Sequence, residues 1–319
     1  MEKFNSIGLK QSFVDAREKV TGSARYLDDL EFPGLLTGKI LRSPYPHARI
    51  LSIDTSAAEA LPGVKAVITA KDCPQNKFGM EIADVDMLAV EKVRYVGDEV
   101  AAVAAENDEI AREALKLIKV EYEELPVVDD PVKAMEKDSP LVHEEKGTNV
   151  AREYHIQRGD IEADFASCDY VFEKEFSTHR VSGLYLEPFG AVAQWESNGR
   201  LTVWTGLQSA FQGRNEIAKA LGIKPTQVTV KSPFIGGGFG AKIWIRNFHP
   251  IAAVLAKKTG RPVKILLTRD EEQLTTRPRI APRMKVKLGM MKDGTMVCKQ
   301  ATIVADNGAY SWAAPKVLL

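Results

Sequence analysis

The chain has 319 residues, which is enough for two domains, since domains usually run to about 100–200 residues. Hydrophobic residues make up 45% and charged residues 27%, the profile of a folded globular protein and not of a disordered or fibrous one. Lys plus Arg number 43 and Asp plus Glu also number 43, so no overall field attracts nucleic acid or an anionic membrane. These values exclude neither local patches nor any enzyme class.

The cysteines and the apolar runs indicate the cellular compartment of the protein. Cys73, Cys168 and Cys298 lie far apart in the sequence without C-x-x-C spacing, which argues against a disulfide framework, a zinc site or an iron–sulfur cluster within this chain. No apolar run approaches the roughly 20 residues that span a bilayer, and residues 1–15 lack the apolar segment of a secretory signal. We therefore expect a cytoplasmic protein with neither a nucleic-acid nor a membrane partner.

After an N-terminal tail at 1–15, residues 16–130 alternate predicted strands and helices. Ser56, with Glu59 three residues on, gives the signal of a capping box for a short helix, and Asn107 is expected to cap a second helix whose first turn is acidic. We expect the segment KVEYEEL to return as a strand and close a β-α-β unit. The predicted strands are residues 38–43, 64–69, 99–106 and 119–125.

Residues 131–150 mix prolines, a glycine and many charges without periodicity, which predicts a linker to a second domain at 151–319. That domain has hairpin signals around Asn198-Gly199 and Lys292-Asp293-Gly294, and a helix expected to end at Gly260. Strands and helices in mixed order with several hairpins indicate two α+β domains. The apolar end at Val317, Leu318 and Leu319 suggests that more chain or another subunit covers this surface. The predicted elements are strands at 170–179, 191–196, 201–206, 227–234, 262–269, 284–291 and 295–306, and helices at 212–221 and 250–260.

The strongest local motif is the Gly-rich loop GGGFGAK at 236–242, directly after a predicted strand. Four glycines in five positions let backbone N–H groups approach a ligand closely, an anion above all. A tight strand-to-helix connection without a ligand explains the same residues equally well. The loop fits neither G-x-x-x-x-G-K-[ST] nor G-x-G-x-x-G, which weakens a nucleotide-binding interpretation.

The segment SPFIGGGFGAK resembles the cofactor loop of the molybdenum hydroxylases, the family of xanthine dehydrogenase, aldehyde oxidase and aerobic carbon monoxide dehydrogenase. Three further regions agree with that family in order and spacing. Residues 14–50 and 93–128 are similar to the start and end of its α/β-hammerhead domain, and residues 177–223 to the start of its cofactor-binding region. The segments 257–279 and DNGAY continue the likeness over nearly the whole chain.

The resemblance implies an α/β-hammerhead domain followed by an incomplete molybdenum-cofactor-binding α+β domain. It implies a molybdenum–molybdopterin cofactor, commonly the cytosine dinucleotide form in bacteria, and hydroxylation of a carbon centre with oxygen from water. The family's later cofactor loops, substrate-side arginine and catalytic glutamate would lie beyond Leu319, so no catalytic residue is assigned here. The expected partners are a second molybdopterin subunit or the chain's own C-terminal half, a 2Fe-2S subunit and an FAD subunit.

Position by position, the resemblance places Gln208 and Phe239 beside the ligands of molybdenum. Without the family, a turn or helix-cap role is more common for Gln208, and core packing for Phe239. For Lys242, reaching a phosphate and sitting in solvent are equally supported. The resemblance implies that the cofactor is held by Gln208, Gly237, Gly238, Phe239, Gly240 and Lys242.

Three further residues attract a functional interpretation. Glu187, in LYLEP, could act as a base if it were buried near the metal, but the family's base lies elsewhere and a structural, hydrogen-bonded role is favoured. His179 and Arg180 form either an anion-binding pair or an ordinary arrangement with a partly buried histidine.

One departure from the family bears on the substrate. Purine-oxidising relatives place a glutamate after the loop lysine, whereas Ile243 and Trp244 stand here. The sequence therefore favours an N-heterocyclic, aldehyde or related small-molecule substrate over xanthine. The alternative to an enzyme component is a scaffold or assembly module of the same fold that binds no metal.

Overall fold

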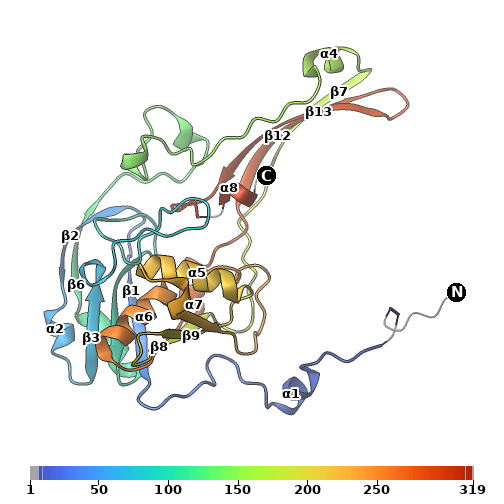
Figure 1. The fold of residues 1–319 in the computed structure, drawn as a ribbon. Coiled ribbons are helices and arrows are strands. Elements are labelled where there is room, and N and C mark those ends of the chain that lie inside the picture. Colours follow the sequence, from blue (N-terminus) through green and yellow to red (C-terminus); the bar gives the residue numbers. More distant parts are fainter. Residues whose placement is uncertain (1–6, 9, 313, 318–319) are drawn as a thin grey trace.

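The computed structural model describes residues 7–8, 10–312 and 314–317, and its helices and strands follow one another in mixed order (Figure 1). This arrangement confirms the predicted α+β class. The strands are β1 Leu36–Arg42, β2 Ala48–Asp54, β3 Val64–Thr69, β4 Lys92–Val93, β5 Glu99–Ala105, β6 Lys119–Glu124, β7 Tyr170–Ser177, β8 Gly190–Trp195, β9 Leu201–Trp204, β10 Val228–Lys231, β11 Val263–Leu266, β12 Ala281–Met290 and β13 Met296–Asp306. The α-helices are α1 Ala16–Thr21, α2 Ser56–Glu59, α3 Asp108–Leu117, α4 Ile161–Ala166, α5 Ala210–Leu221, α6 Phe248–Thr259, α7 Arg269–Thr275 and α8 Ala314–Val317. The 3-10 helices are η1 Ala70–Asp72, η2 Lys133–Met135, η3 Glu144–Lys146 and η4 Pro225–Gln227.

A seven-stranded mixed sheet forms the centre of the body, in the order β10-β9-β8-β11-β1-β5-β3. The pairs β9–β10 and β1–β11 are parallel, and the other neighbouring pairs are antiparallel. Because β1 pairs with β11, strands from the segment 16–130 and from the segment 151–319 share one sheet. The sequence division at 131–150 therefore separates two stretches of chain that hydrogen-bond to each other in space.

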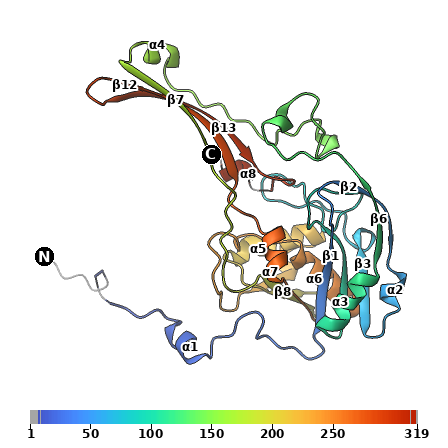
Figure 2. The same cartoon turned by 180° about the vertical axis from the view of Figure 1, so that it is seen from behind.

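Helices cover both faces of this sheet. Successive residues of β5 point to opposite sides, so Ala102 and Ala104 belong to the core that contains residues of α5 and α6, whereas Ala101 and Val103 belong to the core that contains residues of α2 and α3. Figure 2 shows these helices around the sheet. Every residue of β5 is buried. The continuous apolar run EVAAVAA is thus explained by a strand with a core on each side.

Two local predictions for the first segment need correction. Thr55, not Ser56, precedes α2, and the predicted capping box is absent because the Ser56 N–H donates to the Asp54 carboxylate at 3.0 Å. The predicted β-α-β unit is also wrong, since β6 pairs with β2 and not with β5, in a separate three-stranded sheet of the order β4-β2-β6. The amphipathic helix after Asn107 is confirmed, and the Asn107 side chain accepts from the Ile110 N–H at 2.9 Å.

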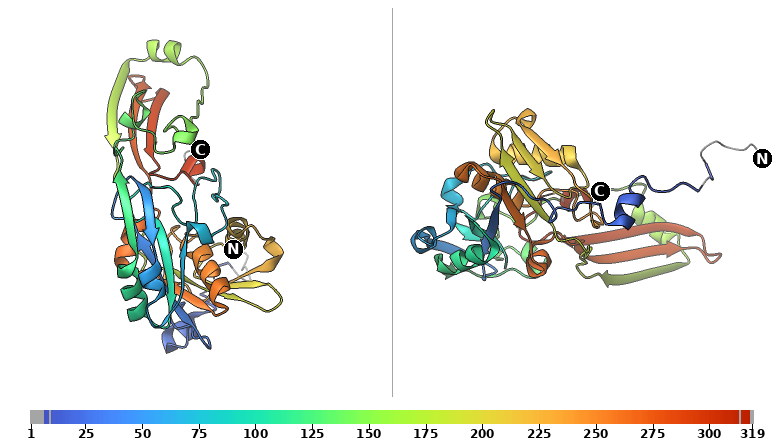
Figure 3. Two further views of the ribbon diagram at one scale, coloured as in Figure 1. Left: turned by 90° about the vertical axis from the view of Figure 1, so that its left-hand side faces the viewer. Right: turned by 90° about the horizontal axis from the view of Figure 1, so that it is seen from below.

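The third sheet, in the order β13-β12-β7, projects from the body and carries α4 at its outer end (Figures 1 and 3). The predicted hairpin at 284–306 is confirmed as the antiparallel pair β12–β13. At its base the sheet is held by the segment after β13, where the Tyr310 hydroxyl donates to Asp98 at 3.0 Å and the Ser311 N–H donates to Asp84 at 2.7 Å.

The projecting sheet also brings together two cysteines that are 130 positions apart in the sequence. The Sγ atoms of Cys168 and Cys298 lie 4.0 Å apart, next to Gly289, and both thiols are free. Leu318 and Leu319, expected to need cover, lie outside the described residues. Among the residues described, no helix has the length and apolar character needed to cross a membrane.

Candidate functional site

The Gly-rich loop joins β10 to α6 and contains backbone in the left-handed region. Gly237 and Gly240 have φ values of 95° and 89°, which glycine adopts without strain. Phe239 has φ 48°, and Leu184 has φ 40°. A Cβ built on Gly183 would lie 3.3 Å from the Phe239 Cβ, so the two strained residues are close in space. Such strain, of order 1–3 kcal/mol per residue, concentrates at functional sites.

Gln208 is fixed against this loop through both its backbone and its side chain. Its backbone N–H donates to the Lys242 carbonyl at 2.8 Å, and its Oε1 accepts from the Gly240 N–H at 3.1 Å. The Cα of Gly238 faces the same side chain, because an added Cβ would lie 2.6 Å from Gln208 Oε1. With Oε1 engaged, the exposed amide presents its Nε2 donors away from that bond.

Three consecutive backbone donors of the loop lie next to Gln208. The N–H groups of Gly237, Gly238 and Phe239 donate to no acceptor among residues 7–8, 10–312 and 314–317, whereas the flanking N–H groups of Gly236 and Gly240 are both bonded. Neutral donors arranged in this way suit an anion or the oxygen of a metal complex. The donors of the loop therefore fit the oxygen ligands of a molybdenum–molybdopterin group.

Phe239 stands on the surface of the loop, with 77% of its area exposed. Core packing, the alternative weighed for this residue, is thus wrong. A loop that only connects a strand to a helix, without a ligand, does not need an exposed aromatic ring. The exposed ring of Phe239 beside the loop N–H groups therefore favours a ligand-binding loop.

Lys242 does neither of the two things expected of it. Its side chain is wholly buried, and its Nζ donates to the carbonyl oxygen and to Oε2 of Glu187, both at 2.9 Å. Burial lowers the pKa of Lys242, and the Glu187 carboxylate opposes that effect. The ammonium lies 4.4 Å from the Tyr185 ring centroid, a cation–π distance. Lys242 therefore faces inward, away from any phosphate on the loop surface.

Glu187 is a structural residue, as the sequence favoured. Its Oε2 accepts from the Gly236 N–H at 2.8 Å, and its own N–H donates to the Gly236 carbonyl at 3.1 Å. A second oxygen, Oε1, accepts from the Leu27 N–H at 3.5 Å. Both carboxylate oxygens are thus occupied, so Glu187 fixes the first glycine of the loop and is not free to act as a base.

Two family models together cover most of the chain. Residues 142–319 match the molybdopterin cofactor-binding domain, and residues 21–126 match the aldehyde oxidase and xanthine dehydrogenase a/b hammerhead domain. The chain belongs to the molybdopterin-binding subunits of this family. Both parts of the predicted fold are thereby confirmed, in the predicted order.

Two curated relatives show how much of such a subunit the chain spans. It is 43% identical to a probable xanthine dehydrogenase subunit of Bacillus subtilis, over 95% of this chain and 40% of that one. It is 36% identical to the nicotinate dehydrogenase large molybdopterin subunit of Eubacterium barkeri, over 99% of this chain and 74% of that one. The chain therefore spans about 40% of the first relative and about three quarters of the second.

Solved structures agree in fold and in coverage. The chain superposes on quinoline 2-oxidoreductase from Pseudomonas putida 86 with a TM-score of 0.87 and 33% identity, over 94% of this chain and 39% of that one. Carbon monoxide dehydrogenase from Oligotropha carboxidovorans gives a TM-score of 0.85 and 37% identity, over 93% and 39%. These relatives are oxidoreductases, which confirms the expected enzyme family.

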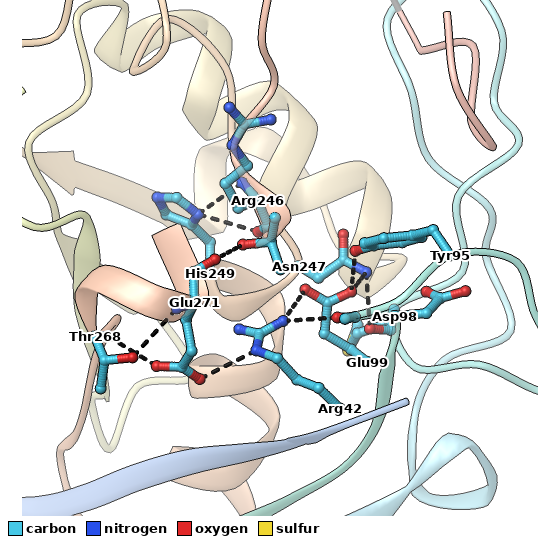
Figure 4. Close-up of polar contacts among 12 residues, drawn as sticks. Arg42, Tyr95, Asp98, Glu99, Arg246, Asn247, His249, Thr268 and Glu271 are labelled. Carbon is cyan, nitrogen blue, oxygen red and sulfur yellow. Dashed lines mark hydrogen bonds and ion pairs between the residues drawn. The ribbon is translucent and has the colours of Figure 1, made fainter. Parts of the chain in front are cut away.

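A buried histidine that the sequence analysis missed, His249 in α6, bonds to Arg246 in the segment that follows the Gly-rich loop (Figure 4). His249 Nδ1 accepts from the Arg246 N–H at 2.9 Å, so Nε2 carries the proton and donates to the Thr205 hydroxyl at 3.0 Å. Thr205 in turn donates to the Gly190 carbonyl at 2.7 Å. Burial lowers the pKa of His249 to about 3, so the ring stays neutral. The isolated His in the apolar helix run FHPIAAVL was the signal for it.

Arg246 and a second network tie the end of the loop to the body. The Arg246 guanidinium donates to the Ala241 carbonyl at 3.1 Å. One residue on, the Asn247 amide donates to Glu99 Oε2 at 3.1 Å, and Arg42 donates to Glu99 Oε1 at 2.9 Å (Figure 4). The segment that joins the Gly-rich loop to α6 is thus hydrogen-bonded to β5, and this bonding limits the movement of the loop.

The other residues singled out in the sequence lie outside the loop. Arg180 forms an ion pair with Asp306, so it does not join His179 in an anion site, and His179 itself is exposed and not partly buried. Ile243 follows the loop, with its Cδ1 4.0 Å from where a Gly240 Cβ would lie. An apolar side chain therefore stands next to the loop at this position.

Proposed function

We propose that this chain holds a molybdenum–molybdopterin cofactor against its Gly-rich loop as one part of a molybdenum hydroxylase. The observation that carries the proposal is the bond between the Gly240 N–H and Gln208 Oε1. It turns the neutral Nε2 donors of Gln208 outward, beside the N–H groups of residues 237–239, which donate to no acceptor in the described part of the chain. This set donates hydrogen bonds to an oxygen or sulfur ligand without adding charge.

When bound, the cofactor, in the molybdopterin cytosine dinucleotide form, supplies the redox chemistry that places a water-derived oxygen on a carbon centre of the substrate. Gln208, Gly237, Gly238, Phe239 and Gly240 hold and orient it. Phe239 provides an apolar surface beside the donors, which keeps water from competing for them. Lys242 does not contact the cofactor in this proposal. It positions Glu187, which in turn positions Gly236 of the loop.

The proposed substrate is an N-heterocycle, an aldehyde or a related small molecule. Ile243 supports this choice, because it offers no carboxylate beside the loop to bind a polar purine edge. The substrate's other contacts and the catalytic base belong to the part of the subunit that the chain does not span.

The proposed partners follow from the coverage of the relatives. The chain spans about 40% of most of them, and one is named a large molybdopterin subunit. We propose that a second molybdopterin subunit, or the rest of its own subunit, completes the site, and that electrons pass to iron–sulfur and flavin subunits. Cys298 lies in β13 and Cys168 lies next to it before β7, so neither is at the loop, which supports electron transfer through partners.

The test is molybdenum content per complex, measured by elemental mass spectrometry on the chain purified with its partners from its native host. Gln208→Leu keeps the side-chain volume but removes the amide, and we expect it to lower molybdenum content at least about tenfold, which corresponds to the loss of about 1.4 kcal/mol of binding. Gln273→Leu, at an exposed position on α7, is the matched control and should leave the content unchanged. A stable wild-type complex without molybdenum would instead support the scaffold alternative.

A further inference from the structure

The two faces of the projecting sheet β13-β12-β7 differ in chemistry. The strand register places every second residue of each strand on the same side. On one side nine apolar residues line up across the three strands, with Lys174 and Lys299 as the charged positions. We call this side the apolar face, and its apolar members are Tyr170, Phe172, Phe176, Met284, Val286, Leu288, Met290, Ala301 and Ile303.

The opposite side is charged and partly covered. Glu173 on this side forms an ion pair with Lys285 at 2.5 Å. Helix α4 packs over its outer end, where the Phe165 ring lies 4.3 Å from Lys287 Nζ and next to Gly289. Helix α4 therefore covers part of the charged side of the sheet and not the apolar face.

The apolar face is open to solvent in this chain. Phe172, Phe176 and Ile303 expose 56%, 51% and 52% of their area. Single exposed apolar residues are normal, but a contiguous patch across three strands marks an interaction surface. The sheet projects away from the body (Figure 3), and all nine apolar residues of this face are at least partly exposed.

The exposure continues along the chain toward the cofactor loop. Leu184 and Leu186, on the segment between β7 and β8, are exposed, and Gly183 on the same segment faces the exposed Phe239. A partner that covers the apolar face and this segment therefore also reaches the loop. The apolar face and the Gly-rich loop therefore lie at the two ends of one exposed surface.

We propose that the apolar face docks the part of the molybdopterin subunit that this chain does not span. The inference rests on the proposed function and names the surface through which the site is completed. Three observations select this occupant: the solved relatives are about two and a half times longer than the matched region, the face leads to the loop, and the described residues of the chain leave it exposed. The docking segment should carry apolar residues along one side and carboxylates opposite Lys174 and Lys299.

The test compares two neighbouring residues of β13 that point to opposite faces. Ile303→Glu places a charge in the apolar face, and Thr302→Glu places the same charge on the other side, at a position that is also exposed. The tagged chain is purified from its native host, and the amount of the remaining molybdopterin-subunit sequence bound to it is quantified by mass spectrometry. We expect Ile303→Glu to lower that amount more than about tenfold and Thr302→Glu to change it less than about twofold.

Hydrogen–deuterium exchange on the wild-type complex gives a second measurement that does not depend on a variant's folding. The backbone amides of β7, β12 and β13 should gain protection when the partner is bound. Retained binding in Ile303→Glu, equal loss in both variants with no change in exchange, or absence of molybdopterin-subunit sequence from the wild-type preparation would overturn the proposal. A stable dimer of the chain alone, broken by Ile303→Glu in sedimentation, would assign the face to a second copy and also overturn it.

Molybdenum content measured on the same preparations separates this inference from the proposed function. A complex with a protected apolar face and no molybdenum would support the docking proposal and contradict the proposed cofactor role. A molybdenum-loaded complex that Ile303→Glu leaves intact would support the cofactor role and contradict the docking proposal.

Discussion

Strands β5 and β7 are of similar length, yet all seven residues of β5 are buried and all eight of β7 are exposed. The first lies between two layers of helices in the body, and the second lies in the projecting sheet. The body therefore holds a hydrophobic core of its own, whereas the projecting sheet is held by its base and by strand pairing. The body is therefore stabilised within this chain, and the projecting sheet is the region that we propose a partner covers.

The largest expected difference between the two regions is in stability, and two isoleucines measure it. Ile265 in β11 is 2% exposed, and Ile303 in β13 is 52% exposed. Ile265→Ala should lower the free energy of unfolding by about 2–5 kcal/mol through lost burial and a cavity. Ile303→Ala should change it by less than about 0.5 kcal/mol. Urea unfolding followed by circular dichroism measures both. Equal effects would show that the projecting sheet has a core within this chain.

A smaller effect concerns the joint between the regions, where Tyr310 donates to Asp98. Burial raises the pKa of Asp98 to about 7, and the adjacent Glu99 adds to this. A raised folded-state pKa gives stability that is present below the unfolded pKa near 4 and is lost as pH rises through 7. Wild type should therefore lose up to about 1.4 kcal/mol per pH unit from this group between pH 4 and 7.

Asp98→Asn should remove that slope, and the difference between variant and wild type is the quantity to measure by urea unfolding at several pH values. Asp138→Asn, at an exposed position, is the matched control and should keep the wild-type slope. An unchanged slope in Asp98→Asn would mean that Asp98 is ionised in the folded chain over this range and that the joint does not depend on its proton.

Features that depend on neighbouring residues could be predicted from the sequence. The Asn107 cap, the helix that ends at Gly260 and the hairpins at Asn198-Gly199 and 292–294 each depend on a few adjacent positions. The Gly-rich loop was found in the same way. Its partner Gln208, 32 positions from Gly240, came only from the family resemblance, since no local pattern links the two.

Features that depend on distant pairing could not be predicted. The strand β6 follows α3 directly, yet it pairs with β2, and this choice depends on which faces find cover in the folded chain. Lys242 looks like a surface lysine until Glu187, 55 positions away, provides a buried partner. Cys168 and Cys298 are far apart in sequence and adjacent in space for the same reason.

The most direct test of the cofactor role uses two glycines near the loop. A Cβ at Gly238 would lie 2.6 Å from Gln208 Oε1 and displace that side chain, whereas a Cβ at Gly206 would meet its nearest neighbour at 3.5 Å, an ordinary contact. Neither glycine has a positive φ, so alanine adds no backbone strain at either position. In complexes purified from the native host, the account predicts that Gly238→Ala lowers molybdenum content several-fold, while Gly206→Ala keeps it. Full molybdenum content in Gly238→Ala would contradict the role given to Gln208 and its loop.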